Sequence, residues 1–140
     1  MMAQPHMKDQ LAYLIASLNR QLEADLNERL RPHGAPIDQY RILEVLNARE
    51  PRAMGEIALL ALIETPTLTK IIDRMTSEGL VYRMPDPVDR RRVLIMTAPA
   101  GKAFYKSLRG AATAQEKRIR DVLQSEKAAE LRNMLRELLQ

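Results

Sequence analysis

The clearest helix signals in the chain lie in the segment Glu64-Thr-Pro-Thr-Leu-Thr-Lys-Ile-Ile-Asp-Arg-Met-Thr-Ser-Glu-Gly79. Thr65 can cap a helix through its hydroxyl, and Pro66 suits the first helical turn because it has no N–H to lose. Gly79 can end the helix in a left-handed conformation. We therefore predict a helix that starts after a Thr65 cap and ends at Gly79. Its apolar residues recur at the spacing of one helix face: Leu68, Ile71, Ile72 and Met75.

The opposite face of this helix carries hydroxyl, amine, carboxylate and guanidinium groups. The hydroxyl, amine and guanidinium groups can contact the base edges and phosphates of DNA. An ordinary solvated helix face has the same composition, so this face alone leaves both interpretations open. Its members are Thr67, Thr69, Lys70, Asp73 and Arg74.

Two short segments of strand composition follow this helix and flank a rigid, basic connection. Residues 80–82 and 93–95 are rich in β-branched and aromatic side chains and are bounded by turn residues. The connection is Pro85-Asp-Pro-Val-Asp-Arg-Arg-Arg92. Three successive arginines on a stiff hairpin tip suit insertion into a narrow, electronegative minor groove, although a solvated run of charge is the alternative. These arginines are Arg90, Arg91 and Arg92.

A second short helix is expected before the first one, after the break at Glu50-Pro51-Arg52. Its buried side is predicted to carry Ile57, Leu60 and Ala61. We therefore predict that residues 53–97 form two short helices that meet at a tight turn and are followed by a two-stranded hairpin. This shape can place one helix in a DNA groove and an arm in the neighbouring groove.

Residues 53–97 resemble the winged helix-turn-helix of the MarR family of bacterial and archaeal regulators. The resemblance extends more loosely from about Leu11 to the C-terminus. Its most specific part is the wing pattern Asp-Pro-x-Asp-Arg-Arg, since the helix pattern occurs in many winged helices. The residues that carry it are Thr65-x-x-x-x-Lys70-Ile-Ile-Asp-Arg74, Glu78-Gly-Leu-Val-x-Arg83 and Asp86-Pro-x-Asp-Arg-Arg91.

This resemblance implies a homodimeric repressor or activator whose binding to double-stranded DNA is relieved by a small molecule, in the family often an aromatic acid. It also implies that Arg91 enters the minor groove and that Asp73 steadies it. The DNA-binding residues predicted on both grounds are Thr65, Pro66, Thr67, Thr69, Lys70, Asp73, Arg74, Arg90, Arg91 and Arg92.

Helical stripes of apolar residues near both ends of the chain predict a dimer interface. A long helix with a narrow apolar seam needs a partner, and packing within its own domain is the alternative. The interface residues that we predict are Leu11, Leu14, Leu18, Leu22, Leu131, Leu135 and Leu138.

With 140 residues, the chain is expected to form a single, mainly α domain. Residues 36–98 would form the winged helix-turn-helix lobe with a two-stranded wing, and residues 8–31 and 99–140 would form flanking dimerisation helices. Met1 to Met7 would form a frayed tail. The net charge of +4 favours polyanions only weakly. The absence of cysteine excludes disulfides and thiol chemistry, and no apolar run approaches the roughly 20 residues of a membrane span, so we expect a cytoplasmic protein.

Nothing in the sequence favours an enzyme, a cofactor or a metal site. The two histidines, His6 and His33, have no catalytic partners placed by sequence, and no glycine-rich phosphate loop or metal motif occurs. The resemblance places effectors between the dimerisation helices and the DNA-binding lobe, where Tyr13, His33 and Tyr40 could line the space. Plain packing or capping roles for these three residues are the alternative.

The function predicted from the sequence is therefore transcription regulation by a homodimer on a pseudo-palindromic operator, repressing until an effector binds. Two recognition helices would occupy successive major grooves, roughly 34–36 Å apart. Two other classes stay open: a winged helix used as a protein-interaction module, and a DNA-binding protein with no effector.

Overall fold

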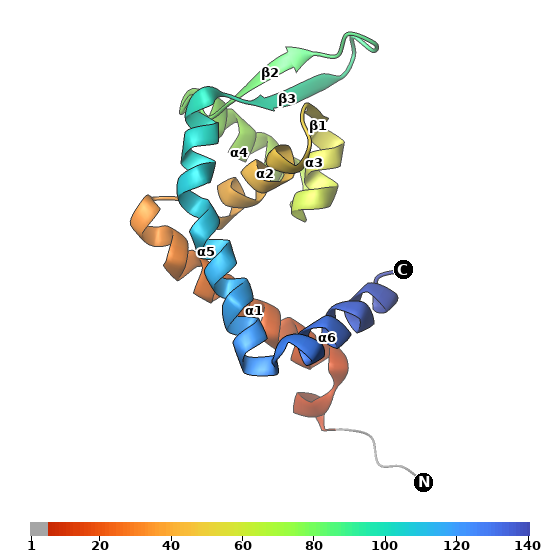
Figure 1. The fold of residues 1–140 in the computed structure, drawn as a ribbon. Helices are drawn as coiled ribbons and strands as arrows, with labels where there is room; N and C mark the ends of the chain where they lie inside the picture. The colour runs from red at the N-terminus through yellow and green to blue at the C-terminus, as the bar shows by residue number, and fades with distance from the viewer. Residues whose placement is uncertain (1–5) are drawn as a thin grey trace. The chain divides into compact units, whose positions relative to one another are not determined.

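The computed structural model describes residues 6–140 of the chain (Figure 1). These residues form two compact units. One consists of Leu30–Arg109, and the other consists of the residues up to Arg29 together with Gly110–Gln140. The predicted tail lies mostly outside the described residues, and Met7 already begins a short 3₁₀ turn, η1 (Met7–Asp9).

The Leu30–Arg109 unit contains the predicted helices and hairpin in the expected order. The predicted fold class, a mainly α winged helix-turn-helix, is confirmed. The elements are η2 (Arg31–His33), α2 (Ile37–Ala48), β1 (Arg52–Ala53), α3 (Met54–Ala61), α4 (Thr65–Ser77), β2 (Val81–Pro85), β3 (Val93–Thr97) and the first turns of α5 (Pro99–Leu123).

The sheet has three antiparallel strands in the order β1-β3-β2, so it contains the predicted two-stranded wing and one further strand, β1, that was not predicted. β2 and β3 form the hairpin, with Arg83 opposite Ile95. β1 pairs on the other side of β3, with Ala53 opposite Leu94. A strand of two residues that follows a proline is too short to show the alternation by which strands are recognised.

The apolar face of α4 forms the centre of the core of this unit. Leu68, Ile72 and Met75 are completely buried, as predicted, whereas Ile71, the fourth member of the predicted stripe, is only half-buried. They share the core with fully buried residues of α2, α3, β3 and α5, among them Ile42, Ile57, Ile95 and Leu108. The prediction for Leu60 was wrong, since 51% of its surface is exposed.

The ends of α4 differ in how well they were predicted. Thr65 is the first helical residue rather than the cap, and the cap position is Glu64, whose side chain makes no capping hydrogen bond. At the other end Gly79 has a φ of 76°, as predicted. Its N–H donates to the Thr76 carbonyl, and the Leu80 N–H donates to the Met75 carbonyl, so the end of the helix is closed.

The other unit is built from α1 (Leu11–Leu30), the later turns of α5 and α6 (Ser125–Leu138). Asp25 of α1 connects to α5: it accepts hydrogen bonds from Gln115 at 2.9 Å and Arg118 at 3.1 Å. Hydrogen bonds from Arg29 and Gln115 lower the pKa of Asp25 below its ordinary value, so the carboxylate stays ionised near neutral pH.

Gly101 permits a close backbone approach between α5 and the start of β2. A Cβ atom at this position would lie 2.0 Å from the Leu80 carbonyl oxygen and 2.8 Å from Cγ2 of Thr97. The same carbonyl accepts a hydrogen bond from the Ala98 N–H at 2.9 Å. Because the obstructing atom belongs to the backbone, a side chain here would have to displace either α5 or the segment that leads into β2.

We therefore expect Gly101→Ala to destabilise the protein by about 1–3 kcal/mol or more, the usual cost of overpacking. Gly110→Ala, in the same helix, is the matched control because nothing lies within 4 Å of its added Cβ. The control should be neutral or stabilising by up to about 1 kcal/mol, since alanine favours helices. Urea denaturation followed by circular dichroism measures both, and equal stabilities of the two variants would contradict the packing argument.

Candidate nucleic-acid interface

The outer face of α4 presents polar groups to solvent. Thr65, Pro66, Thr67, Thr69 and Lys70 are all exposed. The hydroxyl of Thr69 donates to the Thr65 carbonyl at 3.1 Å, so it is committed to the helix. Lys70 has no hydrogen-bond or ion-pair partner among residues 6–140, so its ammonium group is free to contact a phosphate.

The two remaining charged residues of this face are paired within the protein. Nε of Arg74 donates to Glu78 at 2.9 Å, one helical turn further on. Asp73 forms an ion pair with Arg83 of β2, and no contact with Arg91 is found among the described residues. The expected pairing of Asp73 with Arg91 is therefore replaced in this structure by Arg83. Arg83 stands on the strand that leaves α4, and this placement brings its guanidinium to Asp73.

The hairpin tip is ordered by its aspartates. Oδ1 of Asp86 accepts hydrogen bonds from the backbone N–H groups of Val88 at 2.8 Å and Asp89 at 3.3 Å. Oδ1 of Asp89 accepts one from the Arg91 N–H at 3.0 Å. Side chains of aspartate commonly close turns in this way. The two acidic residues of the wing pattern thus fix the loop from which the arginines project.

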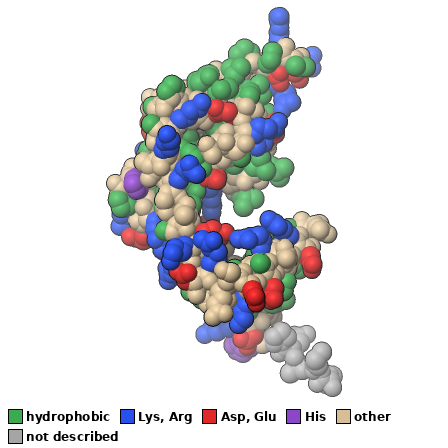
Figure 2. Space-filling model, viewed as in Figure 1, with side chains coloured by type: hydrophobic (Ala, Val, Ile, Leu, Met, Phe, Trp, Pro, Cys, Tyr) green, Lys and Arg blue, Asp and Glu red, His purple; other side chains and the backbone are tan. Residues whose placement is uncertain are grey.

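The three arginines of the tip differ in their surroundings. Arg90 and Arg91 are exposed, and their guanidinium groups have no partner in the part of the chain that the structure describes. Figure 2 shows Lys and Arg side chains projecting at the end of the β2–β3 hairpin. Arg92 instead lies 3.3 Å from Glu56 of α3 and 3.9 Å from Asp86. The sequence did not distinguish Arg92 from its neighbours.

The predicted effector residues do not line either of two cavities in the structure. One cavity, of about 620 Å³, lies between α2 and α5 and is lined by residues that include Asn47, Glu50, Lys102, Lys106 and Arg109. The other, of about 820 Å³, lies among α1, α5 and α6 and is mostly apolar. His33 and Tyr13 are exposed, and Tyr40 is buried.

Tyr40 belongs to a cluster of two tyrosines and a carboxylate. Its ring stacks on that of Tyr105 with 6.3 Å between the centroids. Both hydroxyls donate to Glu44, at 3.0 and 2.6 Å. Burial and the hydrogen bond to Glu44 raise the pKa of both phenols, that of Tyr105 to about 12. The tyrosines therefore stay neutral and serve as hydrogen-bond donors.

Residues 6–140 hold no group of three or more His, Asp or Glu residues that could bind a metal ion. Within the same range, every helix is too short or too polar to cross a membrane.

Two short helices, a buried stripe on the second of them and a hairpin with a basic tip define the winged helix-turn-helix class of proteins. The model of the MarR family matches residues 36–93 of the chain. The HTH-type transcriptional regulator FarR of Neisseria gonorrhoeae is 31% identical over 100 residues, which span 71% of this chain and 68% of FarR. The chain belongs to the MarR family, whose members are transcriptional regulators and not enzymes.

Solved structures share the fold over nearly the whole chain. One is the transcriptional repressor CouR, bound to a 23-mer DNA duplex, with a TM-score of 0.86 and 23% identity. The match covers 100% of this chain and 99% of CouR. BpsR of Bordetella bronchiseptica, whose structure concerns regulation of its DNA binding by 6-hydroxynicotinic acid, has a TM-score of 0.88 at 19% identity, with 97% of each chain covered.

Proposed function

We propose that the protein is a sequence-specific DNA-binding transcriptional regulator that acts as a homodimer on a pseudo-palindromic operator. Among residues 6–140, both elements proposed to face DNA carry cations that have no partner within the protein, and this supports the proposal. Lys70 stands on the outer face of α4, and Arg90 and Arg91 stand on the hairpin tip. A cation without a protein partner can contact phosphates or bases without first breaking an ion pair.

In this proposal α4 enters the major groove and the wing reaches the neighbouring minor groove. Thr65, Thr67 and Lys70 would contact bases and phosphates near the start of the helix, since recognition helices use their first turns for this purpose. Arg91 would enter the minor groove, with Arg90 beside it on phosphates. Asp73 and Arg74 would contribute after exchanging their partners within the protein, and Pro66 sets the entry of the helix.

A homodimer is proposed because much of the apolar stripes of the other unit is exposed among residues 6–140. Leu11, Leu14 and Leu18 of α1 are 73%, 47% and 49% exposed, respectively. On α6, Leu135 and Leu138 are 38% and 68% exposed. The apolar cavity beside them is lined by Leu18, Leu22 and Leu131 among others. Leucines spaced along helices in this way are typical of helix-to-helix association.

An effector that relieves DNA binding is part of the proposal. BpsR, a structural relative, is described as regulated by 6-hydroxynicotinic acid, which motivates a search among aromatic carboxylates. In this chain Tyr13, His33 and Tyr40 remain the predicted contacts. The cavity between α2 and α5 offers a second place, because Lys102, Lys106 and Arg109 line it and an acid group suits cationic side chains.

The proposed DNA binding is tested by fluorescence anisotropy with duplex DNA from upstream of the protein's own gene. A shuffled duplex of equal composition is the reference. We expect a preference for the upstream duplex that survives near-physiological salt. Lys70→Ala should weaken binding to both duplexes and reduce the salt slope by about one unit, the effect of one phosphate contact.

Arg91→Ala in the same assay should cost about 1–3 kcal/mol on the upstream duplex only, as expected for a base-contacting arginine. Lys127→Ala, which removes one exposed lysine of the other unit, serves as the control for a simple loss of charge. Equal and steeply salt-dependent binding to both duplexes would contradict sequence-specific regulation. Absence of binding to this duplex and to any sequence enriched from a random pool would favour the protein-interaction module.

The homodimer is tested by Leu14→Asp, which places a charge in the exposed stripe of α1. We expect a monomer by light scattering and a large loss of operator affinity, because each half-site would have to be bound separately. Ala16→Asp puts the same charge on the other side of the helix and should leave the dimer intact. A Leu14→Asp protein that remains dimeric would remove this stripe from the interface.

The effector is tested by measuring the melting temperature with a panel of aromatic carboxylates. A ligand that binds only the native state stabilises it by about 2.7 kcal/mol at a concentration of 100 times its dissociation constant. We expect at least one acid to raise the melting temperature and to weaken operator binding. A panel without any stabilising acid would favour the DNA-binding protein that lacks an effector.

A further inference from the structure

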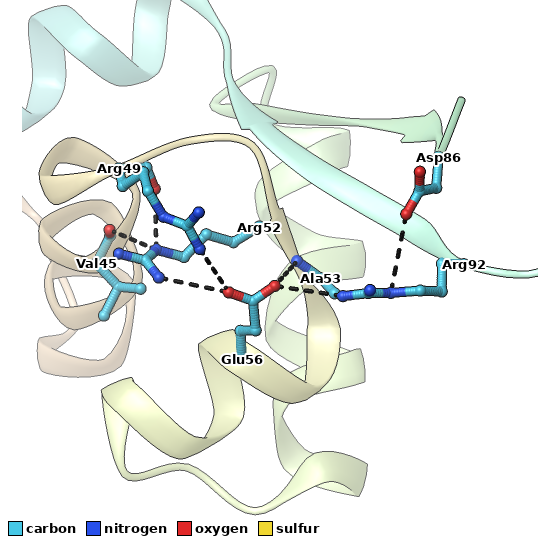
Figure 3. Close-up of polar contacts among 7 residues, drawn as sticks. All are labelled: Val45, Arg49, Arg52, Ala53, Glu56, Asp86 and Arg92. Atoms are coloured by element: carbon cyan, nitrogen blue, oxygen red, sulfur yellow. Dashed lines mark hydrogen bonds and ion pairs between the residues drawn. The ribbon is translucent and has the colours of Figure 1, made fainter. Parts of the chain in front are cut away.

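Glu56, in the first turn of α3, is the centre of a polar cluster that reaches the wing (Figure 3). Its Oε2 accepts a hydrogen bond from Nη2 of Arg49 at 2.9 Å and lies 3.5 Å from Nη1 of Arg52. Its Oε1 accepts from the Ala53 backbone N–H at 3.4 Å and from Nη2 of Arg92 at 3.3 Å. Each carboxylate oxygen therefore has two donors, and these four contacts define the orientation of the side chain.

One side of this cluster is held firmly by the body of the unit. The side chain of Arg52 is only 12% exposed. Its Nε donates to the carbonyls of Arg49 at 2.9 Å and Val45 at 3.3 Å, at the end of α2. Together with the bond to the Ala53 N–H, this arrangement orients Glu56 independently of the wing.

The other side of the cluster is the wing. Arg92 lies between Glu56 and Asp86, since its Nε is 3.9 Å from the Asp86 carboxylate. The backbone N–H of Asp86 donates to the Arg92 carbonyl at 3.1 Å, and the Arg92 N–H donates to the Asp89 carbonyl at 3.0 Å. Arg92 therefore connects α3 to the residues that close the hairpin tip.

We propose that Glu56 is a positioning residue for the wing: it holds Arg92 as an anchor, which leaves Arg90 and Arg91 as the arginines that contact DNA. The consequence for DNA recognition rests on the proposed function, whereas the anchoring itself does not. A single exposed ion pair contributes little to stability, but an anchor needs only to bias the direction of a short hairpin. Glu56 would act through Arg92 and would touch no DNA itself.

The cluster also has an excess of positive charge, with three guanidinium groups around one carboxylate. The hydrogen bond from Ala53, with the three arginines, keeps the pKa of Glu56 below its ordinary value although desolvation opposes this. The carboxylate is therefore ionised at neutral pH. Removing its charge would leave Arg49 without this partner and Arg92 with only the 3.9 Å contact to Asp86. Both arginines, which are 66% and 50% exposed, would then be more available for contacts with any phosphate.

Two effects of opposite sign therefore distinguish positioning from a general structural role. Loss of the anchor should reduce discrimination between operator and unrelated DNA. Release of arginines should at the same time strengthen binding to unrelated DNA. A variant that merely unfolded part of the lobe would weaken binding to both.

The anchoring is tested in the free protein by amide hydrogen exchange, measured by NMR on the full-length chain. Glu56→Gln is the informative variant because its amide oxygen can still accept the Ala53 N–H. We expect the amides of Asp86 and Arg92 to exchange roughly two- to fivefold faster, the range set by the loss of an exposed ion pair. The Ala98 amide, bonded to Leu80 at 2.9 Å, should be unchanged.

Arg92→Ala should accelerate exchange of the Asp86 amide to a similar degree, and the double variant should add nothing further, because both changes break one connection. Glu116→Gln is the matched control: it removes the same charge from an exposed ion pair with Arg132 in the other unit. It should leave the tip amides as in the unmodified protein. Unchanged tip exchange in Glu56→Gln would overturn the assignment, whatever the protein does with DNA.

The consequence for recognition is tested by anisotropy on the operator and shuffled duplexes. For Glu56→Gln we expect tighter binding to the shuffled duplex, a salt slope steeper by up to about one unit for each released arginine that meets a phosphate, and a smaller ratio of operator to shuffled affinity. Faster tip exchange with an unchanged ratio would overturn the positioning role. An unmodified protein without any sequence preference would instead overturn the proposed function, and the exchange result would still decide whether Glu56 anchors the wing.

Discussion

The burial of the inner stripe of α4 determines which polar groups of this helix are presented to solvent. Leu68, Ile72 and Met75 have no exposed surface, so the rotation of the helix about its axis is fixed. Because side-chain directions follow from helix geometry, this rotation sends Thr67 and Lys70 outward. A rotation by one residue would bury Thr69 and Asp73 instead, at the cost of desolvating a charge. Hydrophobic packing thus selects the polar groups that are available for the proposed contacts with DNA.

The wing depends on a different kind of interaction. Val88 at its tip is 93% exposed, so no apolar burial can hold the loop. Its order comes from the carboxylates of Asp86 and Asp89, which accept backbone N–H groups, and from Arg92, which connects the tip to α3. Ionic contacts at an exposed site weaken as salt screens them. The helix and the wing of one DNA-binding unit therefore respond differently to solution conditions.

The sequence predicted those features that hydrophobic periodicity and glycine determine. The end of α4 at Gly79 and its buried stripe are examples. Periodicity failed where an element was short or uniformly apolar. β1 has only two residues. Leu60 lies in an unbroken apolar run near the end of α3, so the sequence alone does not show which residues of this run face the core. The sequence also did not predict which polar side chains pair with one another. Asp73 meets Arg83 because β2 leaves α4 in a particular direction, which depends on the tertiary structure.

The different surroundings of the three arginines follow from strand geometry, which gives Arg92 a position that its neighbours lack. Side chains alternate between the two faces along an extended chain, and Arg92 precedes β3 by one residue. It therefore shares the parity of Leu94, which is 9% exposed and pairs with Ala53. Glu56 follows Ala53 by three residues, which is the spacing at which a side chain returns to the backbone N–H at the start of a helix. The strand pairing that covers Leu94 thereby brings the carboxylate of Glu56 to Arg92. Arg90 and Arg91, which lie farther from β3 in the loop, have no such partner among residues 6–140.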